Sequence, residues 1–432
     1  MSIILSLVQL ITILTVCFYE YKSRSISIFM WATLLIMFGI PHFLSGITGI
    51  YLLNNSVMDK ASIFVIMFNL IYLITKIIID SVMKNKIKSN SIEEKLNYTL
   101  LSRDKLMLIL FFIILLFSLL IILWVSQSYF GGISKSSWGN FYLLNKELGF
   151  TSPVKYADFL FFASAGVILV FKSIRCYHLY YICFLLIAFY SAITNNRITI
   201  LPAFMALIIP VIFSNKQRIS IKKVLYFFSM AIVVIYSVYL LRLVRFSGGI
   251  YNFVSSFDFL QANSLILEML LTGDGELGLR NAFYYFIYIN NNFPGFNEGS
   301  TYIRLLLIGI PTMLAQGIKP QDFAITMGSA YTNNISNTSY SMHPTLYGDC
   351  FANFWWFGVF LAVFWAVFSY LIGILVNRKN YVVKYMLLVL FGSVFIIAGR
   401  GSVYNGFFIG FESSIIIGIF YLLTRLRFKL NR

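Results

Sequence analysis

The chain has 432 residues, of which 59% are hydrophobic and only 11% are charged. Because soluble domains average about 25% charged residues, this composition excludes a water-soluble globular protein. The net charge of +17 would indicate nucleic-acid binding in a soluble protein, but in a membrane protein it first reports orientation. Three scattered histidines and four widely separated cysteines indicate neither a metal site nor a disulfide scaffold.

Apolar runs long enough to cross a bilayer as helices recur along the whole chain. We therefore predict an all-α, polytopic membrane protein with about 11 transmembrane helices, in a single integral membrane domain over residues 1–432. The first run lacks a basic start and a small-residue cleavage site, so we expect it to remain as a membrane helix. The predicted spans are residues 2–19, 27–50, 61–79, 105–127, 155–172, 178–194, 198–214, 224–241, 353–376, 385–399 and 403–424.

The positions of Lys and Arg predict the orientation of these helices, because short cytoplasmic loops retain basic residues. Two thirds of the 33 basic residues fall in one set of alternate loops, and segments 84–105 and 425–432 hold many of them. We expect this side to be cytoplasmic, which places the N-terminus outside and the C-terminus inside. On the outer side basic and acidic residues balance, so the net charge reports orientation and no nucleic-acid partner is expected.

This orientation leaves two long segments outside, residues 128–154 and residues 242–352. Loops of more than about 15 residues are usually functional or disordered, and the second segment is rich in Phe, Tyr and Gly, which are not typical of disorder. We therefore expect the functional site there. Within it, 259–272 is predicted to be an amphipathic helix, and 302–316, which is short and contains Pro311, an interfacial or re-entrant helix.

Three arginines on the outer side are candidates for binding an anion. Arg197 lies in a polar turn between two spans, Arg280 begins an aromatic helical stretch, and Arg304 lies near the start of 302–316. A guanidinium group can bind a phosphate through two parallel hydrogen bonds. The alternative for Arg197 is a contact with lipid headgroups. For Arg280 it is an ion pair with Glu276, four residues away on one helix face.

Proton transfer and sugar binding also have candidate residues in this segment. The imidazole of His343 could accept a proton from a hydroxyl group near neutral pH, although a lone histidine often serves as a structural hydrogen-bonding group. Aromatic rings could stack against the C–H bonds of sugars, or anchor the chain at the membrane interface. The aromatic candidates for sugar binding are Tyr284, Tyr285, Tyr302 and Tyr347.

Three segments carry a resemblance to a known family: GELGLRNAFYYF (275–286), GSTYIRLLLIGIPTMLAQGIKP (299–320) and MHPTLYGDCFANFWWFG (342–358). In these segments and in its overall topology the chain resembles Wzy-type O-antigen or oligosaccharide repeat-unit polymerases. That family is similar to the O-antigen ligases, and both are viewed as glycosyltransferases of the GT-C kind. The resemblance implies a place in the bacterial inner membrane, with the two outer segments as periplasmic loops and the active site facing the periplasm.

The resemblance also implies substrates and roles. The substrates would be undecaprenyl-diphosphate-linked oligosaccharides among membrane lipids, with a chain-length-regulating membrane protein as a candidate partner and without a cofactor. Arg197 and Arg280 resemble two arginines of the family that, with the nearby Arg304, would bind the diphosphate and stabilise the charge on the leaving group. His343 resembles the family's histidine, and it or a carboxylate would take the proton of the attacking sugar hydroxyl. The candidate carboxylates are Glu276 and Asp349.

Three other functions remain open from the sequence. An O-antigen ligase would use the same donor and pass the finished chain to lipid A–core. A flippase or transporter of lipid-linked oligosaccharides usually shows repeated halves with broken helices at the membrane midplane, whereas the polar residues of this chain gather outside. A purely structural membrane protein would leave the arginines and the histidine unexplained.

Overall fold

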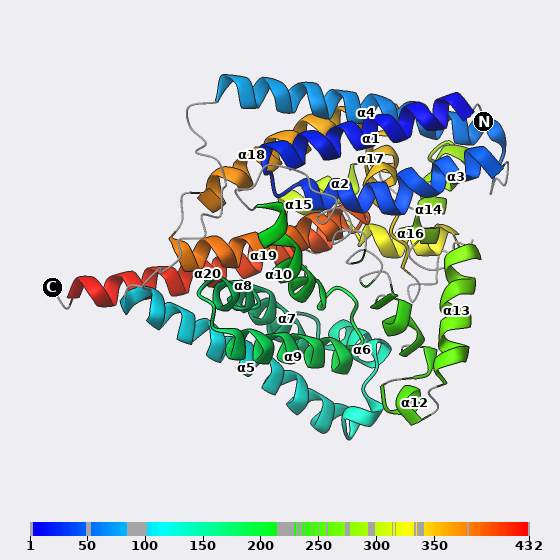
Figure 1. The fold of residues 1–432 in the computed structure, drawn as a ribbon. Coiled ribbons are helices and arrows are strands. Elements are labelled where there is room, and N and C mark those ends of the chain that lie inside the picture. The colour runs from blue at the N-terminus through cyan, green and yellow to red at the C-terminus, as the bar shows by residue number, and fades with distance from the viewer. Residues whose placement is uncertain are drawn as a thin grey trace. The chain divides into compact units, whose positions relative to one another are not determined.

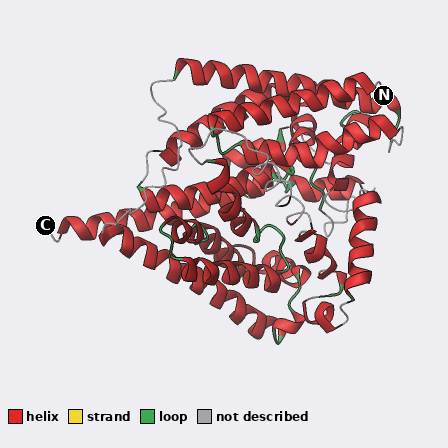
Figure 2. Cartoon of the chain, in the orientation of Figure 1, coloured by secondary structure: helices red, strands yellow, loops and turns green. Residues whose placement is uncertain are grey.

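The computed structural model shows that the chain is built from helices and turns, with no strand among the residues that it describes (Figures 1 and 2). This confirms the predicted all-α class. The described residues are 3–48, 53–83, 102–213, 258–272, 277–292, 299–312, 314–315, 317–331, 334, 341–377 and 380–430, together with parts of 229–255.

Nine helices or continuous helix runs in this described part are long and apolar enough to cross a membrane. The prediction was about 11 spans. Predicted span 198–214 forms only the shorter helix α10 (Leu201–Ile212), and predicted span 224–241 lies largely outside the described residues. The nine are Ile3–Ser23, Ile28–Ile47, Asn55–Val82, Arg103–Phe130, Pro153–Ser173, Tyr177–Thr194, Thr345–Asn377, Tyr381–Gly399 and Val403–Arg425.

Long apolar side chains remain exposed along several of these helices. Ile4, Ile78, Leu120 and Leu185 are examples, each more than half exposed. In water such faces would be covered by a partner or would aggregate, whereas lipid tails are as apolar as these side chains. The helices therefore belong to a multi-pass membrane protein.

The chain folds into two compact units. The first contains Met1–Asn90, Leu270–Asn377 and Val394–Phe408, and the second contains Ser91–Met269, Arg378–Ser393 and Ile409–Arg432. The predicted large loop 242–352 is thus divided, with its larger part in the first unit.

The first unit is built on the three N-terminal spans. Helix α2 (Ile28–Leu34) continues through the π-helical turn η1 (Leu35–Gly39) into α3 (Ile40–Thr48). The turn lies just before Pro41, which has no N–H to donate, and widening the helix there accommodates the missing hydrogen bond. The other helices and turns of this unit are α1 (Ile3–Ser23), α4 (Asn55–Val82), η4 (Leu277–Leu279), α14 (Arg280–Tyr288), α15 (Ser300–Leu306), α16 (Phe323–Tyr331), α17 (Thr345–Phe354), η5 (Trp355–Phe360) and α18 (Leu361–Asn377).

A buried ion pair joins the long helices α1 and α4. Lys76 Nζ lies 4.0 Å from Glu20 Oε1, and both side chains are almost fully buried. The Glu20 carboxylate accepts hydrogen bonds from the Tyr72 hydroxyl (2.8 Å) and the Ser27 hydroxyl (2.6 Å). Lys76 also donates to Ser369 Oγ on α18 (3.1 Å). These contacts hold together α1, α4 and α18, which run side by side in Figure 1.

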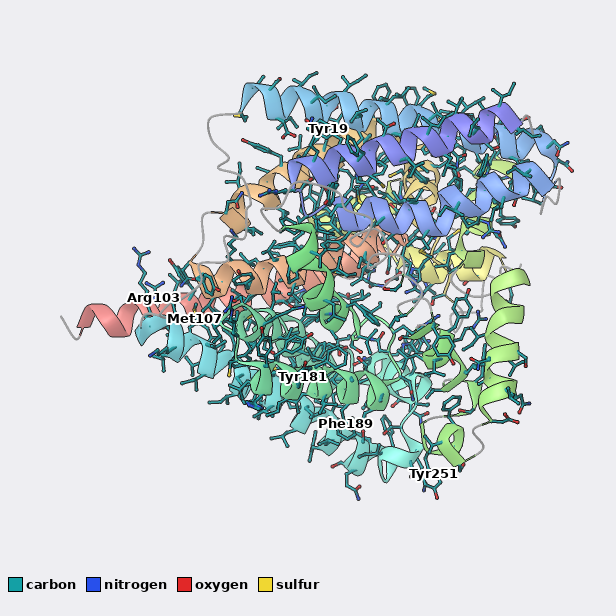
Figure 3. The ribbon with its side chains drawn as sticks, in the orientation of Figure 1. Tyr19, Arg103, Met107, Tyr181, Phe189 and Tyr251 are labelled. Atoms are coloured by element: carbon teal, nitrogen blue, oxygen red, sulfur yellow. The ribbon has the colours of Figure 1, made fainter. Side chains whose placement is uncertain are left out.

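The second unit is built around α5 (Ser102–Phe130). Near its start, Arg103 lies over the Tyr421 ring at 5.0 Å, and Met107 Sδ accepts a hydrogen bond from Thr424 (4.0 Å); Figure 3 labels both α5 residues. The remaining elements are η2 (Ile133–Lys135), α6 (Trp138–Leu148), η3 (Gly149–Thr151), α7 (Pro153–Ser164), α8 (Val167–Ser173), α9 (Tyr177–Thr194), α10, α12 (Ile250–Ser255) and most of α13 (Phe259–Thr272), with the larger parts of α19 (Tyr381–Gly399) and α20 (Val403–Leu430).

The two helices predicted inside the large loop have different outcomes. The predicted helix 259–272 is helix α13. In the predicted helix 302–316, only the start is helical, as part of α15, and turns follow it. Gly309 and Pro311 explain the difference, because both residue types disfavour continuation of a helix.

Candidate functional site

A small polar pocket lies within the first unit, where the large loop meets the turn between α19 and α20. Its volume is about 10 Å³, which is room for roughly one water molecule. A larger ligand would therefore contact the pocket from its open side. The lining residues are Thr301, Asp322, Phe323, Ala324, His343, Asp349, Gly401, Ser402, Val403, Tyr404 and Asn405.

Asp349 places a buried carboxylate in this pocket. It lies on α17 and is 1% exposed. Asn353, one turn further along, donates to the Asp349 carbonyl (2.8 Å) and accepts from Thr301 N (3.0 Å). The hydroxyls of Thr301 and Tyr302 lie near the carboxyl, but among the described residues Asp349 Oδ2 has no hydrogen bond of good geometry. A hydroxyl group of a ligand could supply that partner.

His343 lies in the same pocket, on the extended segment before α17. Its neighbours in the chain are fixed by backbone hydrogen bonds, from Met342 N to Ala324 O (2.9 Å) and from Thr345 N to Arg400 O (3.1 Å). The half-buried imidazole is therefore held at the pocket by its own backbone. The structure thus brings together two predicted catalytic residues, His343 and Asp349.

The turn after α19 closes the pocket by direct backbone contact. Gly401 has φ +96°, and a Cβ atom there would lie 2.4 Å from Thr345 N, at the start of α17. We therefore expect Gly401→Ala to destabilise the protein by about 2 kcal/mol or more, because both the backbone strain and the contact oppose the methyl group. Thermal unfolding of the purified protein measures this. Gly418→Ala is the matched control, since no atom lies within 4 Å of its added Cβ; equal stability of the two variants would contradict the prediction.

Two cations lie at the edge of the pocket, beside Tyr404. The Arg304 guanidinium carbon is 4.3 Å from the centroid of the Tyr404 ring, and Lys319 Nζ is 5.7 Å from it. Arg304 donates to Pro320 O (2.5 Å) and Lys319 to Ile310 O (2.8 Å). Burial, and then the charge of Arg304, lower the pKa of Lys319. A bound anion would offset this repulsion between like charges.

Arg280 lies close by on α14 but does not line the pocket. It is 9% exposed, and it hydrogen-bonds to Tyr284, whose pKa is raised by burial and partly lowered again by the arginine. One turn along the helix, Phe283 packs against Gly348, where an added Cβ would meet the Phe283 Cβ at 3.0 Å. Arg280 is therefore on a helix that packs directly against the Asp349 helix.

A buried chain of hydrogen bonds extends from Arg280 across three further helices. Ser62 donates to Gln9 Oε1 (2.9 Å), so His42 Nε2 must donate to the Ser62 oxygen (2.7 Å). His42 Nδ1 then accepts from the Tyr284 hydroxyl (2.6 Å). The phenol oxygen in turn accepts from Arg280. This chain connects the helix of Arg280 to α1, α3 and α4 through buried polar side chains.

The four tyrosines predicted to bind sugar lie in different surroundings. Tyr284 and Tyr347 are fully buried, Tyr347 donates to Asn69 (2.8 Å), and neither ring lines the polar pocket. Tyr302 lies 3.6 Å from Cys350 Sγ. Burial raises the pKa of Tyr302, which keeps its hydroxyl protonated as a donor. Tyr285 is half-buried, and the sugar-binding role of all four stays a prediction.

Two further predicted site residues lie elsewhere. Arg197 belongs to the second unit, in the turn that follows α9, and is half-buried. Glu276 lies outside the described residues. Their predicted roles remain predictions.

Sequence reasoning missed Asp322, Asn405 and Thr301 as pocket residues. Asp322 caps helix α16 by accepting from Ala324 N (2.9 Å), which is an ordinary role for an aspartate. A signal for Asn405 was present in the polar interruption 400–402 between two apolar runs. The segment with His343 and Asp349, which lines the same pocket, is far away in the sequence, so this signal does not identify a site.

Chemically, the pocket combines an imidazole with two carboxylates, and cations lie at its edge. Such a set can remove a proton from a hydroxyl group and stabilise an anionic group beside it. No family model, curated protein or solved structure matches this chain.

Proposed function

We propose that the protein is a glycosyltransferase of the periplasmic membrane face that polymerises lipid-linked oligosaccharide repeat units, as an O-antigen polymerase does. It transfers the growing chain from undecaprenyl diphosphate onto an incoming lipid-linked repeat unit. The observation that carries this proposal is the pocket with His343 and Asp349, flanked by Arg304 and Lys319. The resemblance of segments 275–286, 299–320 and 342–358 to the polymerase family supports it.

In this proposal a hydroxyl of the incoming sugar enters the pocket. His343 or Asp349 accepts its proton while the oxygen attacks the anomeric carbon of the growing chain. The bond from that carbon to the diphosphate oxygen breaks, and undecaprenyl diphosphate leaves with the electron pair. Since both substrates are lipids confined to one leaflet, positioning them together supplies much of the rate enhancement.

The cations of the site stabilise the departing diphosphate. Arg304 and Lys319 are half-buried beside Tyr404, so a phosphate can reach them. Where water is partly excluded, the electrostatic attraction between these cations and the negative charge that develops on the leaving diphosphate is stronger than in bulk water. Arg280, more deeply buried, contributes a fixed positive field from the neighbouring helix.

The surface polysaccharide of a deletion strain tests this proposal. Loss of a polymerase leaves lipid A–core that carries a single repeat unit. Loss of a ligase instead leaves bare core, and loss of a flippase prevents any repeat unit from reaching the core. A normal ladder of chain lengths in the deletion strain would overturn the proposal.

Arg280→Ala is expected to reduce chain extension by roughly 100-fold or more, because removing one preorganised group that stabilises transition-state charge costs about that much. Lipopolysaccharide ladders from a complemented deletion strain measure it, alongside protein level in the membrane. Tyr284→Phe keeps the ring but removes the hydroxyl that Arg280 contacts, so we expect a smaller loss. The control is Arg425→Ala, an exposed arginine near the end of α20; full ladders from the Arg280 variant would refute its role.

A further inference from the structure

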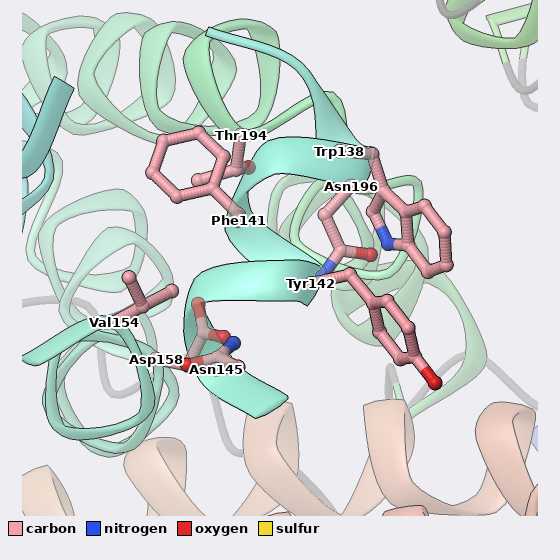
Figure 4. Close-up of a pocket in the computed structure, with 8 residues that line it drawn as sticks. All are labelled: Trp138, Phe141, Tyr142, Asn145, Val154, Asp158, Thr194 and Asn196. Atoms are coloured by element: carbon pink, nitrogen blue, oxygen red, sulfur yellow. The ribbon is translucent and has the colours of Figure 1, made fainter. Parts of the chain in front are cut away.

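A second pocket lies within the second unit, between α6, the first two turns of α7 and the end of α9 with the turn after it (Figure 4). Its volume is about 70 Å³, several times that of the first pocket and room for a few water molecules. None of the residues that sequence reasoning selected for the site lines it. The lining residues are Trp138, Phe141, Tyr142, Asn145, Val154, Asp158, Thr194 and Asn196.

Two parallel aromatic rings form one side of this pocket. Trp138 and Tyr142 are one helical turn apart on α6, and their rings stack with centroids 5.1 Å apart and an angle of 13°. Figure 4 shows both rings on the same side of the helix, with the Asn196 side chain beside them. Ser137 caps the helix by accepting from Asn140 N (3.3 Å), and Phe141 anchors it as a buried residue. The pair is therefore a half-buried aromatic platform on a fixed helix.

Hydrogen-bonding groups surround the rest of the pocket. Asp158 accepts from the Tyr190 hydroxyl (2.7 Å) through one of its two oxygens. Asn145 uses its amide oxygen to accept from Ser152, and Asn196 uses its oxygen to accept from a backbone N–H (3.1 Å). Their amide nitrogens are thus the groups that can donate to a ligand. The pocket offers donors, a carboxylate acceptor and an aromatic platform.

We propose that this pocket is a saccharide-binding subsite for a neutral hexopyranose. The C–H face of the sugar ring would lie on an outer, electron-rich face of the stacked pair of Trp138 and Tyr142. An exocyclic hydroxyl, hydroxymethyl or acetamido group would enter the pocket and bond to Asp158 and the asparagine amides. The eight described lining residues include a carboxylate but no Lys or Arg, which disfavours a phosphate or an acidic sugar.

This subsite rests on the proposed function and sharpens it. Asn196 lines the pocket and Arg197, the predicted diphosphate-binding residue, follows it directly in the same turn. Asn195 ties this turn to the start of α6 by donating to Ser136 O (3.3 Å). A sugar in the pocket would therefore lie next to an arginine suited to the diphosphate. The subsite would hold a sugar close to the lipid end of a substrate.

Binding of simple sugars to the full chain tests the subsite without requiring polymerisation. The protein is placed in lipid nanodiscs and probed with the methyl glycosides of glucose, galactose, mannose and N-acetylglucosamine by saturation-transfer NMR. We expect at least one of them to bind, and Trp138→Ala to weaken that binding by up to about tenfold. Trp138→Phe, which keeps a stacking ring, should retain most of it. Trp124→Ala is the matched control, an exposed tryptophan of the same unit outside the pocket.

Three results would overturn the subsite. They are no binding of any of the four glycosides, binding unchanged in both Trp138→Ala and Tyr142→Ala, and displacement of a bound glycoside by inorganic pyrophosphate, which would mark an anion site. A thermal unfolding curve of each variant shows whether it is folded. If Trp138→Ala is unfolded, the comparison of Trp138→Phe and Tyr142→Ala with the wild type decides.

The subsite and the proposed function can fail separately. Loss of glycoside binding in the Trp138 variant together with a normal polysaccharide ladder in the deletion strain would support the sugar site and reject the polymerase. If glycoside binding is unchanged in the Trp138 variant and chain extension is abolished in the Arg280 variant, the subsite is rejected but the polymerase proposal is supported.

Discussion

His343→Ala is expected to lower the rate of chain extension by about 10²- to 10⁴-fold, the usual contribution of a general base. The imidazole shares a pocket with Asp349 and Asp322, and backbone hydrogen bonds of Met342 and Thr345 hold its segment in place. Its removal should therefore leave the fold intact. Chain extension by purified protein on lipid-linked repeat units measures the rate directly.

The matched control for this variant is His178→Ala, which replaces an exposed histidine at the start of α9. We expect it to keep full activity. His343→Gln retains a hydrogen-bonding side chain but cannot take up a proton at neutral pH, so it should be nearly as inactive as the alanine variant. Substantial activity in His343→Gln would show that the histidine orients a group and that Asp349 or Glu276 is the base.

The helical fold was predictable because its cause is local. A run of apolar residues must bury its backbone polar groups in its own hydrogen bonds once it enters lipid, and only a helix does so within one segment. The residues at which the helices end or are interrupted were less predictable. Predicted span 198–214 becomes the shorter α10, which has Pro202 in its first turn and Pro210 near its end.

The site was only partly predictable, because it depends on contacts between distant residues. His343 and Asp349 are six residues apart in one short segment, and both line the same pocket. Nothing local indicates that the turn 400–402 packs on Thr345. The chain from Arg280 through Tyr284 to His42 joins segments more than 200 residues apart, which no spacing rule within one element detects.

The sequence also did not indicate that Glu20 and Lys76 form an ion pair. Glu20 directly follows the first predicted span and Lys76 lies near the end of the third, both towards the side predicted to be cytoplasmic, and an exposed pair there would contribute little. The structure instead buries both in the helices of the first unit. Ionisable groups in such a position are costly unless paired and fully hydrogen-bonded, and here Tyr72, Ser27 and Ser369 supply the hydrogen bonds.

Lys76→Met is therefore expected to destabilise the protein by about 3–5 kcal/mol, since it leaves the Glu20 carboxylate buried without its counter-charge. The measurement is the midpoint of thermal unfolding in detergent, followed by reaction of a thiol-specific dye with the buried Cys183 and Cys350. Lys60→Met on the same helix is the control, because Lys60 is exposed. A midpoint equal to that of the control would mean that the pair contributes nothing.

The double variant Glu20→Gln with Lys76→Met separates loss of the pair from loss of packing. If the cost of Lys76→Met arises from an uncompensated charge, neutralising Glu20 should recover most of it, because glutamine can still accept from Tyr72 and Ser27. If the lysine stabilises mainly through its packed stem and its bond to Ser369, the double variant should be no more stable than the single one. Recovery would show that the charge interaction between Glu20 and Lys76 stabilises the packing of α1 against α4. Chain extension should then return together with the folded state.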